Sequence, residues 1–255
     1  MNLVNFWERV QGRYRGYVSA AFCRRTIKMR NSTPLISFTF DDFPRSAINA
    51  GGEILKKYGV AGTYYASLGL ANRSSPVGLI FSPADLAKVV ADGHELGCHT
   101  FTHCPAWETD SEVFERAIVE NRRALSTILP HVQFSTMSYP ISDPRPSTKC
   151  RAARHFRCCR GGGQIFNAGT TDLNDLRGFF LEQSARRPAF IKQMIDQNIR
   201  ATGWLIFATH DVCDAPSRFG CTPALFEETV DYAVRSGARI LPVAQALDCV
   251  SPDTD

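Results

Sequence analysis

Short apolar runs alternate along the chain with segments whose apolar residues recur at the helical period. The runs are rich in β-branched and aromatic residues, which is typical of strands. Residues 204–209 (WLIFAT) are apolar almost throughout, as in a strand that is buried on both faces of a parallel sheet. The predicted strands are residues 35–40, 60–67, 94–98, 133–138, 204–209 and 239–241.

The helical segments carry recognisable start signals. Ser82 and Pro83 open one helix, because serine caps a helix N-terminus and proline fits its first turn. Residues 111–129 carry Val113 and Ala117 near the helical period. The predicted helices are residues 47–58, 83–91, 111–129, 146–155, 188–201, 222–236 and 243–247, and residues 160–163 (RGGG) are predicted as a turn.

Alternating strands and helices indicate parallel β–α units. A chain of 255 residues suits one large α/β domain, and no change in composition divides it. With about seven strand candidates, the pattern predicts a single distorted (β/α)7-type barrel over residues 31–255, after a helical extension over residues 1–30. An open doubly wound sheet is the alternative. No glycine-rich nucleotide motif follows a strand, which disfavours a nucleotide-binding enzyme.

Composition changes this picture only in its charge distribution. The chain is 44% hydrophobic and 21% charged, which excludes a disordered or fibrous protein. The net charge of +4 is the sum of two basic segments and a rest of the chain that carries more acidic than basic residues. Residues 1–30 carry seven Lys or Arg and one acid, and residues 145–160 carry six and no acid. Neither is a basic groove interleaved with aromatic residues, so nucleic-acid binding is not expected.

Nine cysteines occur at irregular spacing, and two of them, Cys158 and Cys159, are neighbours whose bridge would be strained. No Cys-x-x-Cys pair indicates a zinc site. The first residues lack the apolar core of a secretory signal, and no run approaches the roughly 20 apolar residues of a membrane span. We therefore expect free thiols in a reducing cytoplasm.

Polar side chains follow several predicted strands, at the edge where parallel α/β proteins carry function. They are Asp41 and Asp42 after residues 35–40, His99 and His103 after residues 94–98, Tyr139 and Pro140 after residues 133–138, and His210 after residues 204–209.

Asp42, His99 and His103 fit a divalent metal, because histidines four residues apart face the same way on a helical turn. Two histidines and one carboxylate leave positions open for water and substrate. Asp41 is then free to act as a base and His210 to protonate a leaving group. Taken singly, the aspartates read as a helix cap and the histidines as surface residues. Their common place on one rim favours a catalytic metal site.

At these residues the sequence resembles the polysaccharide deacetylases (carbohydrate esterase family four, the chitooligosaccharide deacetylase homology domain). Their first motif, Thr-Phe-Asp-Asp, matches residues 39–42, and their second, His-Ser/Thr-x-x-His, matches residues 99–103. Their last motif, Leu-x-His, is partly matched by residues 208–210. The resemblance spans roughly residues 35–245 and implies a distorted β/α barrel with metal-dependent amide hydrolysis.

The resemblance also implies a role for each matched residue. Asp41 would be the general base, and His210 the acid that protonates the leaving amine. Asp42, His99 and His103 would hold the metal. Zinc is expected, and cobalt or nickel would fit the same ligands.

The third motif departs from the family pattern, since it reads Ser-Tyr-Pro-Ile-Ser at residues 138–142. The predicted substrate and oxyanion residues are Tyr139, Pro140 and Ile141. Ile141 would supply a backbone N–H. The family's usual arginine beside the base is absent, and Arg160 is the predicted replacement. Asp172 and Asp175 are candidates for the fourth-motif acid that tunes the catalytic histidine.

These residues predict a metal-dependent hydrolase that removes an N-acetyl or similar acyl group from an amino sugar. Without an export signal, the expected substrate is a cytoplasmic nucleotide-linked or lipid-linked sugar on a route to surface polysaccharide, with residues 145–160 near its phosphate. An amidase for a non-sugar amide and an inactive sugar-binding relative are the alternatives. A complete set of base, acid and ligands disfavours the inactive one.

Residues 1–30 place an apolar stripe along one side of a helix. The stripe consists of Leu3, Trp7, Val10, Tyr14, Tyr17 and Ala21. We expect the stripe to pack on the barrel and the arginines to face water. The alternative is weak contact with an anionic membrane surface. The oligomeric state is not predicted.

Overall fold

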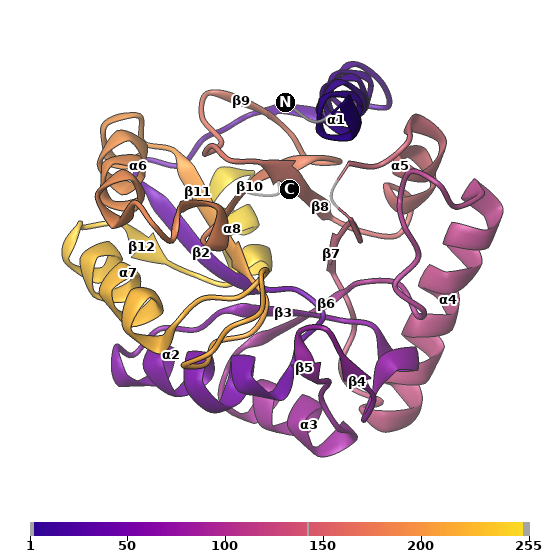
Figure 1. The fold of residues 1–255 in the computed structure, drawn as a ribbon, viewed down its shortest axis with the longest axis horizontal. Coiled ribbons are helices and arrows are strands. Elements are labelled where there is room, and N and C mark those ends of the chain that lie inside the picture. Colours follow the sequence, from indigo (N-terminus) through magenta and orange to yellow (C-terminus); the bar gives the residue numbers. More distant parts are fainter. Residues whose placement is uncertain (1–2, 142, 252–255) are drawn as a thin grey trace.

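The computed structural model describes residues 3–141 and 143–251 of the 255-residue chain. Seven parallel strands form a closed barrel with helices around it (Figure 1). In order around the barrel they are β2 (Leu35–Phe40), β3 (Thr63–Ala66), β6 (Glu95–Cys98), β7 (Thr136–Ser138), β8 (Cys158–Gly163), β10 (Leu176–Phe180) and β11 (Trp204–Thr209). β11 pairs with β2 along six residues, which closes the barrel. The predicted (β/α)7-type barrel is confirmed, and the open sheet is wrong.

The remaining elements surround this barrel. The helices are α1 (Leu3–Ala21), α2 (Glu53–Lys57), α3 (Pro83–Ala91), α4 (Ser111–Ile128), α5 (Pro146–Ala152), α6 (Pro188–Arg200), α7 (Pro223–Arg235) and α8 (Val243–Val250). The outer strands are β12 (Arg239–Ile240) beside β2, β1 (Thr26–Lys28) beside β9 (Thr170–Asp172), and β4 (Ser74–Ser75) beside β5 (Gly78–Leu79).

The predicted start signals act as expected. The Ser82 hydroxyl accepts the Asp85 N–H, and the Asp85 carboxylate accepts the Ser82 N–H at 2.8 Å, so the two residues form a capping box at α3. The apolar strands β2 and β11 are buried at every position. The predicted helix at residues 47–58 is divided, because a π-helical segment over Ala47–Gly52 precedes α2.

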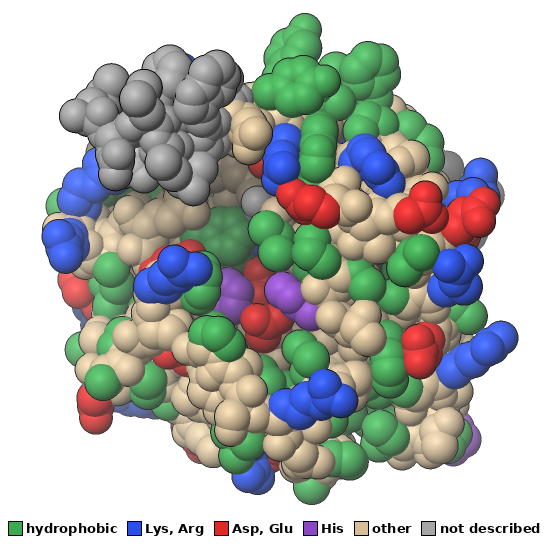
Figure 2. Space-filling view, turned by 45° about the vertical axis from the view of Figure 1, so that its right-hand side comes forward, with side chains coloured by type: hydrophobic (Ala, Val, Ile, Leu, Met, Phe, Trp, Pro, Cys, Tyr) green, Lys and Arg blue, Asp and Glu red, His purple; other side chains and the backbone are tan. Residues whose placement is uncertain are grey.

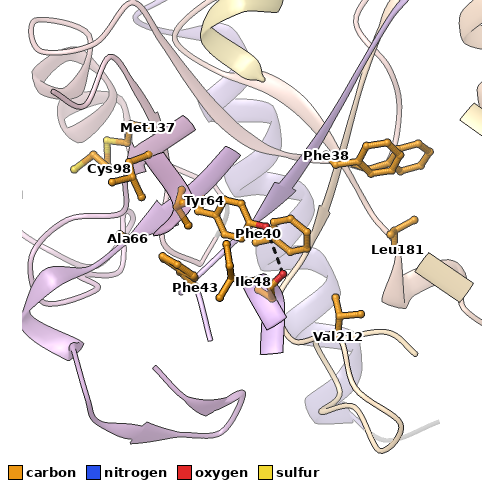
Figure 3. Close-up of a cluster of buried hydrophobic side chains, with 14 of the residues drawn as sticks. Phe38, Phe40, Phe43, Ile48, Tyr64, Ala66, Cys98, Met137, Leu181 and Val212 are labelled. Atoms are coloured by element: carbon orange, nitrogen blue, oxygen red, sulfur yellow. Dashed lines mark hydrogen bonds between the residues drawn. The ribbon is translucent and has the colours of Figure 1, made fainter. Parts of the chain in front are cut away.

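Buried aromatic rings anchor the turn that follows β2. Phe40 stacks on Tyr64 with ring centroids 4.6 Å apart, and Phe43 lies 4.9 Å from the same ring (Figure 3). Both phenylalanines are fully buried. Each contributes on the order of 2 kcal/mol through burial. Because these rings flank Asp41 and Asp42, the core holds the two carboxylates at the rim of the barrel.

The glycine-rich segment at residues 160–163 is a strand, so its prediction as a turn is wrong. It forms the end of β8, between β7 and β10. A Cβ at Gly178 of β10 would lie 2.9 Å from the Gly161 carbonyl and 3.2 Å from Cδ of Arg160. The glycines therefore leave space for the Arg160 side chain, which is fully buried.

The expected packing of the apolar stripe on the barrel is wrong for Tyr14, Tyr17 and Ala21, whereas the side chains of its other members, at residues 3, 7 and 10, lie outside the described residues. The segment is helical over α1, but Tyr14 and Tyr17 are 62% and 76% exposed. Ser19, about 200° around the helix from Tyr17, is fully buried. The described part of the stripe therefore faces outward, and Ser19 contacts the barrel. Among the described residues, no helix is long and apolar enough to cross a membrane.

A disulfide joins Cys23, just after α1, to Cys150 in α5. The expectation that all cysteines are free thiols is therefore wrong for this pair, whereas the other seven are free. Sequence spacing gave no indication of the bond, because the partners are 127 residues apart and meet only through the fold.

Replacing Cys150 with serine is expected to lower the free energy of unfolding by about 3 kcal/mol, because a long cross-linked loop restricts the unfolded chain. Urea unfolding of the oxidised protein measures the difference. Cys249→Ser, at a partly buried free cysteine, is the matched control and should stay close to the parent protein. Equal stability of both variants would mean that the disulfide does not form in solution.

Candidate active site

Three side chains from two strand ends form a candidate metal-ligand set. Nε2 of His99 and Nε2 of His103 lie 3.6 and 3.2 Å from Oδ1 of Asp42. Ligand atoms about 2.0–2.1 Å from a tetrahedral zinc ion lie roughly 3.3 Å apart. Oδ1 of Asp42 is buried and has no hydrogen-bond partner within the described part of the chain. A buried acceptor between two imidazole nitrogens fits a divalent cation.

The backbone around this set is strained. Four residues have φ values in the left-handed region, which residues other than glycine rarely adopt. They are Asp42 at 58°, Phe43 at 52°, Thr100 at 59° and His103 at 55°. Such conformations persist where surrounding structure enforces them, and they cluster at functional sites. Here the packed rings on either side of Asp42 hold its turn in place.

His99 is prepared to act as a ligand by its contacts with Ser138. Nδ1 of His99 lies 2.9 Å from the Ser138 carbonyl oxygen and 2.7 Å from its hydroxyl oxygen. These contacts assign the proton to Nδ1, which donates to Ser138 and leaves the Nε2 lone pair facing Asp42. Burial lowers the pKa of His99 to about 4, so the imidazole is neutral at pH 7 as metal binding requires.

Arg160 supplies the cation that the third motif lacks. Its Nη2 donates to both carboxylate oxygens of Asp41, at 2.5 Å from Oδ2. The guanidinium carbon lies 5.4 Å from the ring centroid of Tyr65 and 5.3 Å from that of Phe180. The structure therefore brings Arg160, from β8, to the side chain that the sequence paired it with.

Asp41 is held as a carboxylate. Burial acts to raise the pKa of Asp41, but the positive charge of Arg160, with smaller contributions from His99 and His210, outweighs burial and holds that pKa well below its usual range. The Ser138 hydroxyl also donates to Oδ1 of Asp41 at 3.0 Å. An ionised carboxylate at this position can accept a proton from a water molecule in the cavity.

The third-motif residues occupy different positions. The Tyr139 N–H donates to the Arg160 carbonyl within the sheet, and its hydroxyl donates to the Asn174 carbonyl at 3.0 Å. Pro140 has no N–H. The Ile141 N–H has no partner among the described residues, and its backbone has a φ of 57°. Of the three predicted residues, only Ile141 can offer an N–H to a substrate oxygen.

His210 follows β11 and is oriented by a backbone carbonyl. Its Nδ1 lies 3.2 Å from the Phe219 carbonyl oxygen, so a proton there leaves Nε2 for the substrate. The candidates for a tuning acid are wrong. Asp172 and Asp175 lie 2.7 and 3.9 Å from Nζ of the buried Lys149 instead.

Glu182 lines the same cavity and was not indicated by the sequence pattern. Its Oε2 is buried without a partner in the described structure. Burial, reinforced by the charge of Asp41, raises the pKa of Glu182 to about 8, so this side chain is a neutral hydrogen-bond donor at pH 7. It follows β10, a strand that the sequence pattern does not predict because its residues show no clear period.

These residues surround one cavity of ≈ 730 Å³, a size that is common for small-molecule sites. Figure 2 shows histidine and acidic side chains together at the floor of this hollow. The lining includes Asp41, Asp42, His99, His103, Tyr139, Ile141, Glu182, His210, Arg218 and Phe219.

The basic segment at residues 145–160 contributes only Arg160 to this site. Lys149 is buried against Asp172, Arg151 pairs with Glu115 at 2.6 Å, and Arg157 pairs with Asp248. The prediction that this segment binds a substrate phosphate is therefore not supported, because most of its charges are satisfied within the fold.

A family model described as polysaccharide deacetylase matches residues 28–156, about half of the chain. The match includes Asp41, Asp42, His99 and His103. No curated protein sequence matches the chain.

Three solved structures share the fold. The chitin deacetylase of the fungal pathogen Colletotrichum lindemuthianum is 16% identical, with a TM-score of 0.62 over 89% of this chain and 91% of that chain. A family 4 acetyl xylan esterase from Clostridium thermocellum, in complex with a cobalt ion, is 17% identical, with a TM-score of 0.57 over 84% and 90%. A carbohydrate esterase family 4 pseudoenzyme from Bacillus anthracis is 12% identical, with a TM-score of 0.59 over 86% and 67%.

Proposed function

Because the chain belongs to the polysaccharide deacetylase family, we propose that it is a metal-dependent hydrolase that removes an N-acetyl or similar acyl group from an amino sugar. The observation that carries this proposal is the convergence of a candidate metal-ligand set and two proton-transfer groups on one cavity. The ligand set is Asp42, His99 and His103, and the two proton-transfer groups are Asp41 and His210.

The reaction consumes one water and yields a carboxylate and a protonated amine. A divalent cation, when bound, supplies a Lewis acid that polarises the acyl carbonyl and acidifies a water molecule. Asp41 accepts the proton of the attacking water. The Ile141 N–H donates to the oxygen on which negative charge develops. His210 acts in its doubly protonated form: Nε2 gives its proton to the leaving amine, while the Phe219 carbonyl holds the Nδ1–H, and the proton taken up by Asp41 returns to solvent after turnover.

We propose zinc as the cofactor, with cobalt or nickel as alternatives, because two imidazoles and a carboxylate suit all three ions. The neutral state of His99 and the unsatisfied oxygen of Asp42 support a bound cation at this place.

The test is release of acetate by the purified, zinc-loaded protein from N-acetylated sugars that are free, nucleotide-linked or lipid-pyrophosphate-linked. Chelation is expected to abolish release, and added Zn²⁺ to restore it. A zinc-loaded protein that releases acetate from none of these sugars would refute the proposal. Hydrolysis of non-sugar amides alone would favour the alternative amidase.

The inactive, sugar-binding alternative rested on the missing third-motif arginine. Because Arg160 donates a hydrogen bond to Asp41, a cation does lie beside the candidate base, and that argument no longer holds. The base, the acid and the ligands are all present at one cavity, which favours turnover.

We propose Arg218 as the residue that binds an anionic group of the substrate. Arg218 lines the cavity and is exposed, with its guanidinium carbon 4.5 Å from the ring centroid of Phe219. No carboxylate pairs with it in the described ranges. An unpaired arginine at the mouth of an active site suits a phosphate or pyrophosphate.

Replacing Arg218 with alanine is expected to raise KM for a phosphate-bearing amino sugar about tenfold, the usual value of a charge-assisted hydrogen bond. KM for the neutral N-acetyl sugar should not change. Steady-state kinetics on both substrates measures the difference, and Arg186→Ala, at an exposed arginine that does not line the cavity, is the control. An equal rise for both substrates would exclude phosphate recognition by Arg218.

The cytoplasmic location proposed from the thiols depends on Cys23 and Cys150. Seven free cysteines suit a reducing compartment, whereas a disulfide persists in an oxidising one. Alkylation of the protein as it is isolated from cells decides between them. Reaction at both Cys23 and Cys150 supports the cytoplasm, and protection of both places the protein in an oxidising compartment.

A further inference from the structure

Helix α1 carries an aromatic face that is largely exposed in the described structure. Tyr14, Tyr17 and the adjoining Phe22 are 62%, 76% and 56% exposed, and Ala21 is also exposed. We call these four residues the outer face of α1. Hydrophobic side chains stand out from the top of the molecule in Figure 2. Among the other large apolar side chains of the described residues, only Ile141, at 63%, is more exposed than Phe22.

The opposite side of α1 is fixed to the barrel by polar and covalent contacts. Ser19 donates to Asp175 at 2.9 Å, and its carbonyl accepts from the buried Lys149 at 2.6 Å. Cys23 is joined to Cys150. The two hydrogen bonds of Ser19 are buried and the disulfide is covalent, so α1 cannot turn its outer face inward without breaking them. The exposure of the aromatic residues is therefore built into the fold.

The charge around the outer face indicates what covers it. Arg13 and Arg24 are exposed beside it, and residues 1–30 carry seven basic residues and one acid. Tyrosine and arginine are the residue types that lie at a lipid headgroup boundary. A basic helix with an apolar face lies in the plane of an anionic membrane. We propose that the outer face of α1 binds the surface of a membrane that contains anionic lipids.

The position of α1 relates this surface to the active site. Arg15 pairs with Glu108 at 2.6 Å, and Tyr14 lies edge-on to Trp107, in the loop that follows His103. Gly16 faces Asp143, two residues after Ile141. The helix therefore lies over the loops that border the cavity. If the proposed function holds, binding through α1 brings the cavity to the lipid surface, and the substrate is an amino sugar on a lipid carrier.

The test is sedimentation of the full-length, zinc-loaded protein with vesicles in the absence of substrate. We expect binding to phosphatidylcholine vesicles that contain phosphatidylglycerol, weaker binding at high salt, and little binding to pure phosphatidylcholine. Arg13→Gln/Arg24→Gln should weaken binding roughly 30-fold, which is about fivefold for each arginine. Tyr14→Ser/Tyr17→Ser should weaken it at both salt concentrations, because the apolar contribution is not screened.

Control variants distinguish a loss of binding at the outer face of α1 from a general loss of positive charge and from a loss of folding. Arg186→Gln/Arg200→Gln removes two exposed arginines, one two residues before α6 and one at its last residue, and should bind as the parent does. Circular dichroism and urea unfolding should show that the serine variant is folded. Equal binding to both vesicle types, no binding to either, or a concentration-dependent dimer that the serine variant abolishes would overturn the proposal. Vesicle binding without acetate release would refute the proposed function and leave the membrane surface standing.

Discussion

Asp41→Asn is expected to lower kcat for deacetylation about a thousandfold while leaving the bound metal in place. Asparagine keeps the shape of the side chain, and its oxygen can still accept from Arg160, but the amide cannot take a proton from water. Asp41 is not one of the three candidate metal ligands, so the affinity for the metal should change little. Kinetics with saturating substrate, together with metal analysis of the dialysed protein, measures both effects.

Asp42→Asn is the matched control, one residue along the same turn. It removes the anionic ligand between His99 and His103, so both metal content and activity should fall. The two variants differ in metal retention alone, which separates a base from a ligand. Loss of metal in Asp41→Asn with retention in Asp42→Asn would show that the two roles are exchanged. Full turnover by Asp41→Asn would remove Asp41 from the mechanism.

Arg160→Met is expected to have the second large effect, on both stability and pH dependence. Arg160 and Asp41 are both buried, so removal of the cation leaves an unpaired carboxylate in the interior. Breaking a buried pair in this way lowers the free energy of unfolding by about 3 kcal/mol or more at neutral pH. Arg187→Met, at an exposed arginine that also stacks on a phenylalanine, should change stability little.

The direction of the pH effect follows from the pKa of Asp41. In the parent protein that pKa lies below its unfolded value, so the stabilisation from Asp41 is complete above the unfolded pKa near 4 and is lost as the pH falls. In Arg160→Met only burial remains as a large influence, and it raises the pKa. The variant should therefore lose stability as the pH rises through that raised value, and the acid limb of its kcat/KM profile should move to higher pH.

Urea unfolding and kcat/KM, each across the pH range 4 to 8, test this pair of effects. Arg160→Lys keeps a positive charge and should restore part of the stability and of the acid limb, although lysine lacks the planar fork. A deficit in Arg160→Met that does not change with pH would show that the arginine serves packing alone.

Most strand ends of the barrel, those of β2, β3, β6, β7 and β11, were predictable because each of these strands carries its signal locally. An apolar run such as β11 indicates by its composition alone that the strand is buried. The candidate ligands Asp42, His99 and His103 follow such runs at the spacing of the family motifs. The missed elements lack that local signal. β8 ends in three glycines, which have no side chains to show a period, and β10 contains one more. With β10 unrecognised, Glu182 at its end could not be assigned to the rim.

The sequence by itself determined the barrel class, the candidate ligands and the candidate base and acid, because strand periodicity and motif spacing are properties of neighbouring residues. Only the tertiary structure decided which distant groups meet. It joined Cys23 to Cys150 across 127 residues, placed Glu182 at the cavity, and turned Tyr17 outward. A local pattern shows that a helix has an apolar side, but the contacts that fix α1 through Ser19 determine which side faces water.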